Sequence, residues 1–200
     1  MNIAVFASGR GTNFAALLRA VKKGKIQASI SLLICDNPKA QALARARRAG
    51  VKVVLVKRED FASRSDFEQK IIQHLKENDI GLIVLAGFMR VLGPDLVNGY
   101  KDKILNIHPA LLPAFKGAHA IQDAFDYGAK ITGVTVHFVD EKMDHGPIIL
   151  QKSLELEEGD TLESLEAKIH KVEHKIYPQA VKLFIEGKLQ LEGRKVRIIQ

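Results

Sequence analysis

The sequence has 200 residues, of which 46% are hydrophobic and 26% charged, with a formal net charge of +7. These values are typical of one globular domain and exclude disordered and collagen-like chains, and no apolar stretch reaches the roughly 18 residues of a membrane-spanning helix. The single cysteine, Cys35, excludes an internal disulfide and a multi-cysteine metal cluster.

The charge and the first residues narrow the class of protein further. The N-terminal segment MNIAVFASGRG has no basic region and runs directly into a strand pattern, so we expect no signal peptide and a cytoplasmic protein. The basic residues are dispersed, with few aromatic residues among them, which argues against a nucleic-acid partner. A small anionic substrate, drawn by the net charge, fits this pattern.

The first half of the chain alternates apolar strands with helical patterns. We expect strands at 2–7, 29–34, 51–56 and 80–86, and helices near 13–23, 39–49 and 65–78. Almost continuously apolar strands that alternate with helices indicate a parallel sheet covered on both faces.

The second half continues with shorter connections. We expect strands at 103–107, 131–139 and 147–154, helices at 119–127 and from residue 161 onwards, and a closing hairpin that turns at 192–193. The predicted fold class is α/β and Rossmann-like: a mostly parallel central sheet with helices on both faces and a mixed or antiparallel C-terminal edge. The chain is expected to form one domain with two halves, 1–100 and 101–200.

The loop ASGRGTNF joins the first strand to the first helix. Gly9 and Gly11 permit a tight turn, and the amide groups of a helix N-terminus favour an anion such as phosphate. A dinucleotide-binding loop requires glycine at position 14, where Phe14 stands, although Asp36 imitates the ribose-binding acid of that motif. An ordinary turn with a Thr or Asn helix cap remains the alternative.

The segment LNIHPALLP carries an amide and an imidazole two positions apart. Asn106 and His108 therefore leave one face of a strand, at the carboxyl end where open α/β sheets place their ligands. The sequence leaves open whether the Leu112–Pro113 bond is cis.

A later segment, HFVDEKMDHGPII, adds an acidic loop after a strand. A carboxylate from this loop beside His108 would favour the imidazolium, which with the Asn106 amide would form an oxyanion site for acyl transfer. An alternative is a metal site of His108, His137 and Asp144, although no compact ligand motif supports it. Because no nucleophile is evident nearby, we expect an amine or water to attack the acyl group directly.

Four separated motifs, SGRGTN (8–13), LAGFMRVL (85–92), LNIHPALLP (105–113) and GVTVHFVDEKMDHGPII (133–149), resemble those of the phosphoribosylglycinamide formyltransferases, within the folate-dependent formyltransferase family. The segment VEHKIYP (172–178) is similar to that family's C-terminal helix. The resemblance implies formyl transfer from 10-formyltetrahydrofolate to the amine of glycinamide ribonucleotide, with no metal. It implies a monomer or homodimer with no nucleic-acid or membrane partner.

The resemblance also implies roles for individual residues. The catalytic residues would be Asn106, His108 and Asp144. Residues that bind the phosphoribosyl substrate would be Gly11, Thr12, Asn13, His170 and Glu173. Residues that bind the folate would be Arg64, Met89, Arg90, Val91, Leu92, Asn106, Asp140, Glu141, Lys142, Met143 and Asp144.

Three positions depart from the family's pattern. Ala110 replaces a usual serine, His145 occupies a variable place in the folate loop, and His170 replaces a polar residue such as glutamine. Two alternative functions remain: a related hydrolase that releases formate, and a non-catalytic phospho-sugar-binding module built on the SGRGTN loop.

Overall fold

The computed structural model describes residues 1–199, and the chain divides after Leu105 into two compact units. The first unit is built on four parallel strands in the order β3-β2-β1-β4. These strands are β1 (Asn2–Phe6), β2 (Ser29–Cys35), β3 (Lys52–Leu55) and β4 (Ile80–Leu85).

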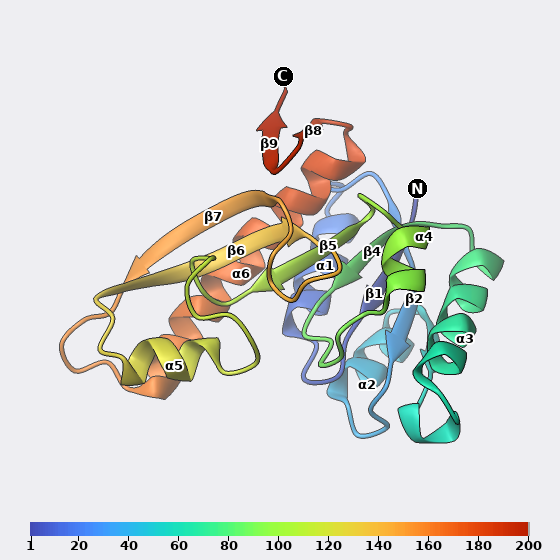
Figure 1. The fold of residues 1–200 in the computed structure, drawn as a ribbon, viewed down its shortest axis with the longest axis horizontal. Helices are drawn as coiled ribbons and strands as arrows, with labels where there is room; N and C mark the ends of the chain where they lie inside the picture. The colour runs from blue at the N-terminus through green and yellow to red at the C-terminus, as the bar shows by residue number, and fades with distance from the viewer. Residues whose placement is uncertain (200) are drawn as a thin grey trace. The chain divides into compact units, whose positions relative to one another are not determined.

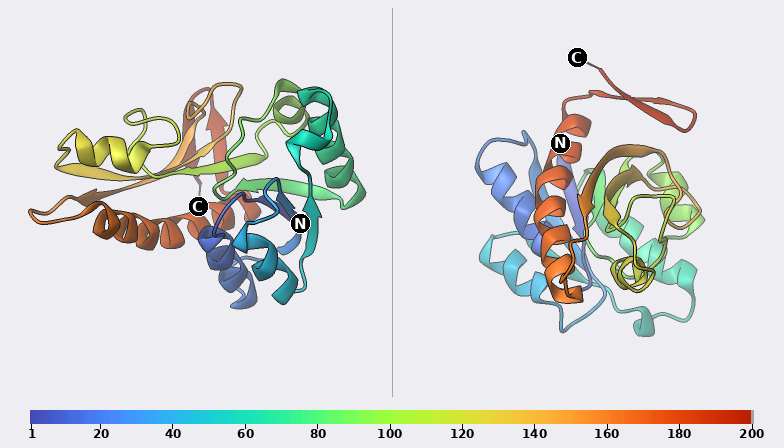
Figure 2. Two further views of the ribbon diagram at one scale, coloured as in Figure 1. Left: turned by 90° about the horizontal axis from the view of Figure 1, so that it is seen from below. Right: turned by 90° about the vertical axis from the view of Figure 1, so that its left-hand side faces the viewer.

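Helices cover both faces of the strands of this unit. They are α1 (Thr12–Lys22), α2 (Gln41–Arg48), α3 (Arg64–Glu77) and the short α4 (Pro94–Gly99). Helices α1 and α2 lie together on one side of the strands, and α3 and α4 lie together on the other (Figure 2). This arrangement buries β1 almost completely, which explains why its sequence is apolar without alternation.

The second unit begins within β5 (Ile104–His108) and continues with antiparallel strands. Strand β6 (Ile131–Phe138) pairs antiparallel with β7 (Ile148–Glu155), and β8 (Leu189–Glu192) pairs antiparallel with β9 (Lys195–Ile198). The order is β6-β7-β9-β8, with one parallel register pair, Ile148 with Lys195, between β7 and β9.

Two helices complete this unit: α5 (Ala120–Asp126) and α6 (Leu162–Ile185). Helix α6 runs along β6 and β7 (Figure 1). It begins with a capping box, in which Thr161 accepts from the Ser164 N–H and Ser164 accepts from the Thr161 N–H. Its buried residues include Leu165, Ile169 and Ile176, as its apolar periodicity indicates.

The predicted fold class is confirmed, since parallel strands between helices precede antiparallel strands toward the C-terminus. Helix α4 was not predicted, because its six residues are too few to show a helical period. The hairpin turn consists of Gly193 and Arg194, one residue later than predicted. Within residues 1–199, none of the helices combines the length and the apolar character needed to cross a membrane.

Candidate active site

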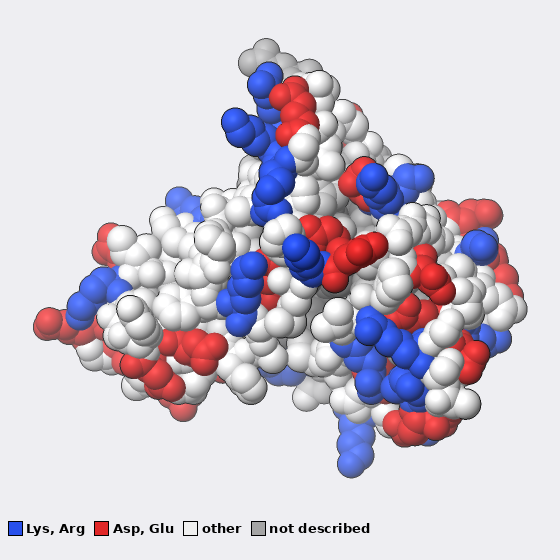
Figure 3. Space-filling view, in the orientation of Figure 1, with Lys and Arg blue, Asp and Glu red and all other residues white. Residues whose placement is uncertain are grey.

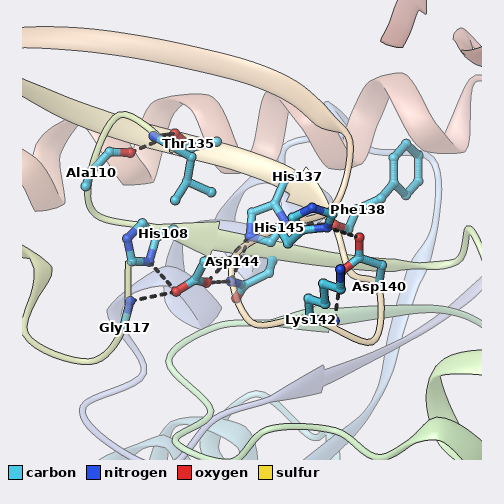
Figure 4. A network of polar contacts seen from close by, with 12 residues as sticks. His108, Ala110, Gly117, Thr135, His137, Phe138, Asp140, Lys142, Asp144 and His145 are labelled. Carbon is cyan, nitrogen blue, oxygen red and sulfur yellow. Dashed lines mark hydrogen bonds and ion pairs between the residues drawn. The ribbon is translucent and has the colours of Figure 1, made fainter. Parts of the chain in front are cut away.

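Three polar side chains of the second unit meet at the end of β5. Asn106 and His108 come from β5, and Asp144 comes from the loop that joins β6 to β7. Asp144 Oδ2 lies 3.4 Å from His108 Nδ1 and accepts a hydrogen bond from the Gly117 N–H at 2.8 Å (Figure 4). Because the side chains of His108 and Asp144 are only 4% and 10% exposed, their electrostatic interaction is weakly screened by solvent.

The second ring nitrogen of His108 also faces an acceptor. His108 Nε2 lies 2.8 Å from the carbonyl oxygen of Phe115, so this nitrogen carries a proton and donates it. With a carboxylate beside Nδ1, the doubly protonated imidazolium satisfies both contacts, whereas a neutral ring satisfies only one. The Nε2–H of His108 thus points at a backbone acceptor that an incoming oxygen could replace.

The Asn106 amide nitrogen lies between two acceptors. It is 3.1 Å from His137 Nε2 and 3.5 Å from Asp144 Oδ1. His137 Nδ1 donates to the Phe138 carbonyl at 2.7 Å, which leaves Nε2 as the acceptor. Burial lowers the pKa of His137, although its bond to Phe138 and the charge of Asp144 oppose this shift, so the ring is neutral.

The loop that carries Asp144 is held by side chains at both ends. Asp140 accepts from the Lys142 N–H at 3.0 Å, and its other oxygen lies 2.7 Å from His145 Nδ1. Burial alone would raise the pKa of Asp140, but the hydrogen bonds from His145 and Lys142 outweigh it and lower the pKa. The loop closes at Gly146, where a Cβ atom would lie 1.9 Å from the Phe138 carbonyl oxygen, so only glycine fits.

A side chain of β6 holds the backbone on both sides of Leu111, next to Ala110. Thr135 Oγ1 donates to the Ala110 carbonyl at 2.7 Å and accepts from the Leu112 N–H at 3.0 Å. The Leu112–Pro113 bond, left open by the sequence, is cis. The Thr135 hydroxyl thus anchors the segment that leads from His108 to Phe115.

In the first unit, the SGRGTN loop leads directly into α1. Gly11 is the residue before the helix and has a φ of 69°, a conformation that L side chains rarely adopt. A Cβ atom there would also lie 2.8 Å from Ala42 Cβ, so glycine is required on two grounds. The residue at the N-cap position of α1 is Gly11 and not the threonine or asparagine of the alternative. Thr12 and Asn13 form the first turn of the helix.

Asp36 is occupied by contacts within the first unit. Ser8 Oγ donates to Asp36 Oδ1 at 2.6 Å and accepts from the Met89 N–H at 3.0 Å, and Arg90 Nε donates to Asp36 Oδ2. The Asp36 side chain is 7% exposed. Both oxygens of this carboxylate are therefore engaged by side chains of the first unit.

Arg64 joins the start of α3 to the segment 89–92. Its Nε donates to Glu68 at 2.8 Å and its Nη2 donates to the Val91 carbonyl at 2.8 Å. Glu68 also accepts from the Gly93 N–H at 2.7 Å. Of the two arginines predicted to meet the folate, Arg90 is part of the segment 89–92 and Arg64 contacts its backbone. Met89 and Val91 of the same segment are exposed.

On α6, His170 and Glu173 face each other. His170 Nδ1 lies 2.8 Å from Glu173 Oε2, and the Glu173 side chain is only 6% exposed. The two residues are one helical turn apart, so the helix fixes their separation. The pair offers a ring nitrogen and a buried carboxylate on one helix face.

Several residues of these sites were not identified from the sequence. Ser8, Gly117 and Phe115 act through a hydroxyl or backbone groups, for which the sequence gives no distinctive signal. His137 was considered only as a metal ligand, and its ring nitrogens are engaged by Asn106 and Phe138. Among residues 1–199, no group of three or more His, Cys, Asp or Glu side chains is placed to hold a metal ion.

Comparisons with known proteins cover nearly the whole chain. The model of the formyl transferase family matches residues 1–181. The chain is 48% identical over 179 residues to the phosphoribosylglycinamide formyltransferase of Bacillus subtilis, which covers 90% of this chain and 92% of that protein. It is 39% identical over 189 residues to the human trifunctional purine biosynthetic protein adenosine-3, covering 94% of this chain but 19% of that protein.

A solved structure supports the same relationship. The crystal structure of glycinamide ribonucleotide transformylase 1 from Symbiobacterium toebii superposes with a TM-score of 0.98 at 42% identity. The superposition covers 100% of this chain and 94% of that chain.

Proposed function

The chain belongs to the formyl transferase family, and on that premise we propose that Asn106, His108 and Asp144 are the catalytic residues of a phosphoribosylglycinamide formyltransferase. The enzyme transfers the formyl group of 10-formyltetrahydrofolate to the amine of 5'-phosphoribosylglycinamide, a step of purine biosynthesis. The observation that carries the assignment of residues is the contact of Asp144 Oδ2 with His108 Nδ1 at 3.4 Å, with the opposite ring nitrogen donating to Phe115.

The roles follow from where charge develops. The neutral amine attacks the formyl carbon, and negative charge gathers on the formyl oxygen. His108 Nε2–H, released from the Phe115 carbonyl, donates to that oxygen, while Asp144 stabilises the positive ring. Such a donor typically contributes on the order of 10²–10³ in rate.

Asn106 supplies the second donor. One amide hydrogen is directed at His137 Nε2, and the other points along the longer 3.5 Å contact to Asp144. The longer contact is the weaker one, so this hydrogen is the one that turns to the oxyanion.

A proton must finally move from the attacking amine to the leaving folate nitrogen. When the tetrahedral intermediate collapses, the bond between the formyl carbon and this nitrogen breaks. We assign His108, whose Nε2–H faces the formyl oxygen in this proposal, or a water bound to it, as the carrier of the proton.

The remaining assignments concern the residues that bind the two substrates, beginning with the phosphate and ribose of the phosphoribosyl substrate. We propose that the backbone and side chains of Gly11, Thr12 and Asn13 bind the substrate phosphate, as the helix N-terminus favours. We propose that Glu173, supported by His170, accepts hydrogen bonds from the ribose hydroxyls.

The folate assignments fall on two segments and two arginines. The proposed folate-binding residues are Arg64, Met89, Arg90, Val91, Leu92, Asn106, Asp140, Glu141, Lys142, Met143 and Asp144. The guanidinium groups of Arg64 and Arg90 suit the glutamate carboxylates of the folate. We further propose that the whole chain works as one formyltransferase domain, as a monomer or homodimer in the cytoplasm.

The test is a spectrophotometric assay with a 10-formyl folate donor, run with and without phosphoribosylglycinamide. We expect folate turnover only when the amine is present. Turnover without the amine would indicate the formate-releasing hydrolase. A folded protein that binds the phosphorylated substrate but turns over no folate would leave only a phospho-sugar-binding module.

A further inference from the structure

The C-terminal hairpin reaches the 140–145 loop at its tip. Gly193 and Arg194 form the two-residue turn between β8 and β9. The register pair between Lys195 of β9 and Ile148 of β7 sets where this turn lies. Because Ile148 follows His145 by three residues, the register brings Arg194 to the end of the loop.

Arg194 contacts both the backbone and the ring of His145. Its Nη2 donates to the His145 carbonyl at 2.7 Å, and its Nη1 lies against the ring, 3.1 Å from His145 Nε2 and 3.3 Å from Nδ1. His145 Nδ1 donates to Asp140 at 2.7 Å. Asp140 in turn accepts from the Lys142 N–H. An uninterrupted series of polar contacts thus runs from the hairpin tip to the middle of the loop.

Asp144 lies inside the segment that these contacts span. It has a φ of 47°, a conformation uncommon for residues other than glycine, and its carboxylate must reach both His108 and the Gly117 N–H. The hydrogen bond from Arg194 holds the carbonyl of the very next residue. A loop of mostly exposed residues, Glu141, Lys142 and Met143 among them, has little apolar burial of its own to hold this shape.

We propose that Arg194 is a positioning residue, which holds the 140–145 loop and the Asp144 carboxylate in the shape that receives the formyl donor. The proposal rests on the proposed function, in which this loop binds the folate. Arg194 is far along the chain from the four motifs that carry the family resemblance. It acts through the loop and not on the reacting atoms.

A matched control lies on the same hairpin. Arg197 is exposed, carries the same charge, and pairs with Glu192 within the hairpin at 3.0 Å. Lys and Arg atoms run along this hairpin at the top of Figure 3, and each alanine variant removes one positive charge from it. A difference between Arg194→Ala and Arg197→Ala therefore reports the place of Arg194 beside the 140–145 loop and not the net charge of the hairpin.

The experiment compares wild type, Arg194→Ala, Arg194→Lys and Arg197→Ala. Steady-state kinetics give KM for the folate donor and for the amine separately. Limited proteolysis with trypsin, followed by mass spectrometry, gives the rate of cleavage after the exposed Lys142. Arg194→Ala and Arg197→Ala each remove one tryptic site from the hairpin, so a difference in cleavage after Lys142 does not come from the number of sites.

For Arg194→Ala we expect a donor KM about tenfold higher, a change of about 1.4 kcal/mol, an unchanged amine KM, and faster cleavage after Lys142. Arg194→Lys keeps the charge but not the forked donor, so it should recover only part of the effect. Arg197→Ala should match wild type.

Equal donor KM and equal cleavage in Arg194→Ala and Arg197→Ala would overturn the proposal. Absence of formyl transfer in the wild type would instead overturn the proposed function, and the cleavage rates would still decide whether Arg194 holds the loop.

Discussion

His137 Nε2 accepts a hydrogen bond from the Asn106 amide at 3.1 Å, because the opposite nitrogen of its ring donates to the backbone of Phe138. The ring is buried and neutral, and burial lowers its pKa. A protonated His137 would present a donor to Asn106 and would turn the amide around. The neutral ring therefore fixes which atom of Asn106 faces the site.

This relationship predicts that His137→Phe is a poor catalyst. The substitution removes the acceptor while keeping a buried ring, so the Asn106 amide loses its fixed orientation. We expect kcat to fall roughly 10- to 100-fold, as small misplacements of catalytic groups typically cause. Single-turnover rates, with circular dichroism as the control for folding, measure this. A kcat within twofold of wild type would mean that Asn106 does not depend on His137.

The catalytic assignment predicts severe losses for His108→Ala and Asp144→Asn. The first removes an oxyanion donor, and the second keeps an acceptor for the Gly117 N–H but removes the charge beside His108. We expect each to lower kcat by about 10²–10³. Thermal melting would show whether the variants are folded. Full activity in either folded variant would contradict the assignment.

The sequence predicts part of this site from strand geometry. A strand has a period of two, so Asn106 and His108 were expected on one face, and both extend from β5 to the same cluster. The proximity of Asp144 was inferred from its loop and from the resemblance. The contact of His137 with Asn106 joins residues 31 apart, so it depends on how the strands are placed.

Other features depend on backbone groups and register. The acceptor for His108 Nε2 is a backbone carbonyl, which every residue has, so no side chain identifies Phe115 in advance. The position of Arg194 is set by one register pair between β7 and β9, and register is not determined by the alternation of a four-residue strand. The strand–helix order of the first unit was predictable because its apolar runs are long and nearly continuous.

The contacts of Asp36 in the first unit lead to a prediction about binding of the folate donor. Asp36→Asn keeps an acceptor for the Ser8 hydroxyl but removes the charge that holds Arg90. Because Arg90 lies in the segment proposed to bind the folate, we expect a donor KM several-fold higher, since an ion pair with one solvent-exposed partner contributes up to about 1 kcal/mol. The measurement is donor KM at saturating amine. Asp60→Asn, at an exposed position of the same unit, is the control and should leave KM unchanged.

The carboxylate of Asp160 predicts a pH-dependent stability that does not involve the active site. It lies just before α6 and accepts hydrogen bonds from Lys168 at 2.8 Å, from Ser164 at 2.7 Å and from the Glu157 N–H at 2.8 Å. Lys168 first and Ser164 second lower the pKa of Asp160 to about 2. The folded protein thus binds this proton less readily than the unfolded chain, in which the pKa of an aspartate is about 3.9.

The sign follows from linkage. A lowered pKa in the folded state contributes stability that is fully present above about pH 4 and is lost as the pH falls toward about 2. Asp160→Asn should therefore lower the free energy of unfolding at pH 7, and its difference from wild type should shrink between about pH 4 and pH 2. Urea unfolding at pH 7, 4 and 2.5 measures this. Glu158→Gln, at an exposed position of the same turn, serves as the control. A difference between Asp160→Asn and wild type that stayed constant down to pH 2.5 would show that the charge of Asp160 does not stabilise the start of α6.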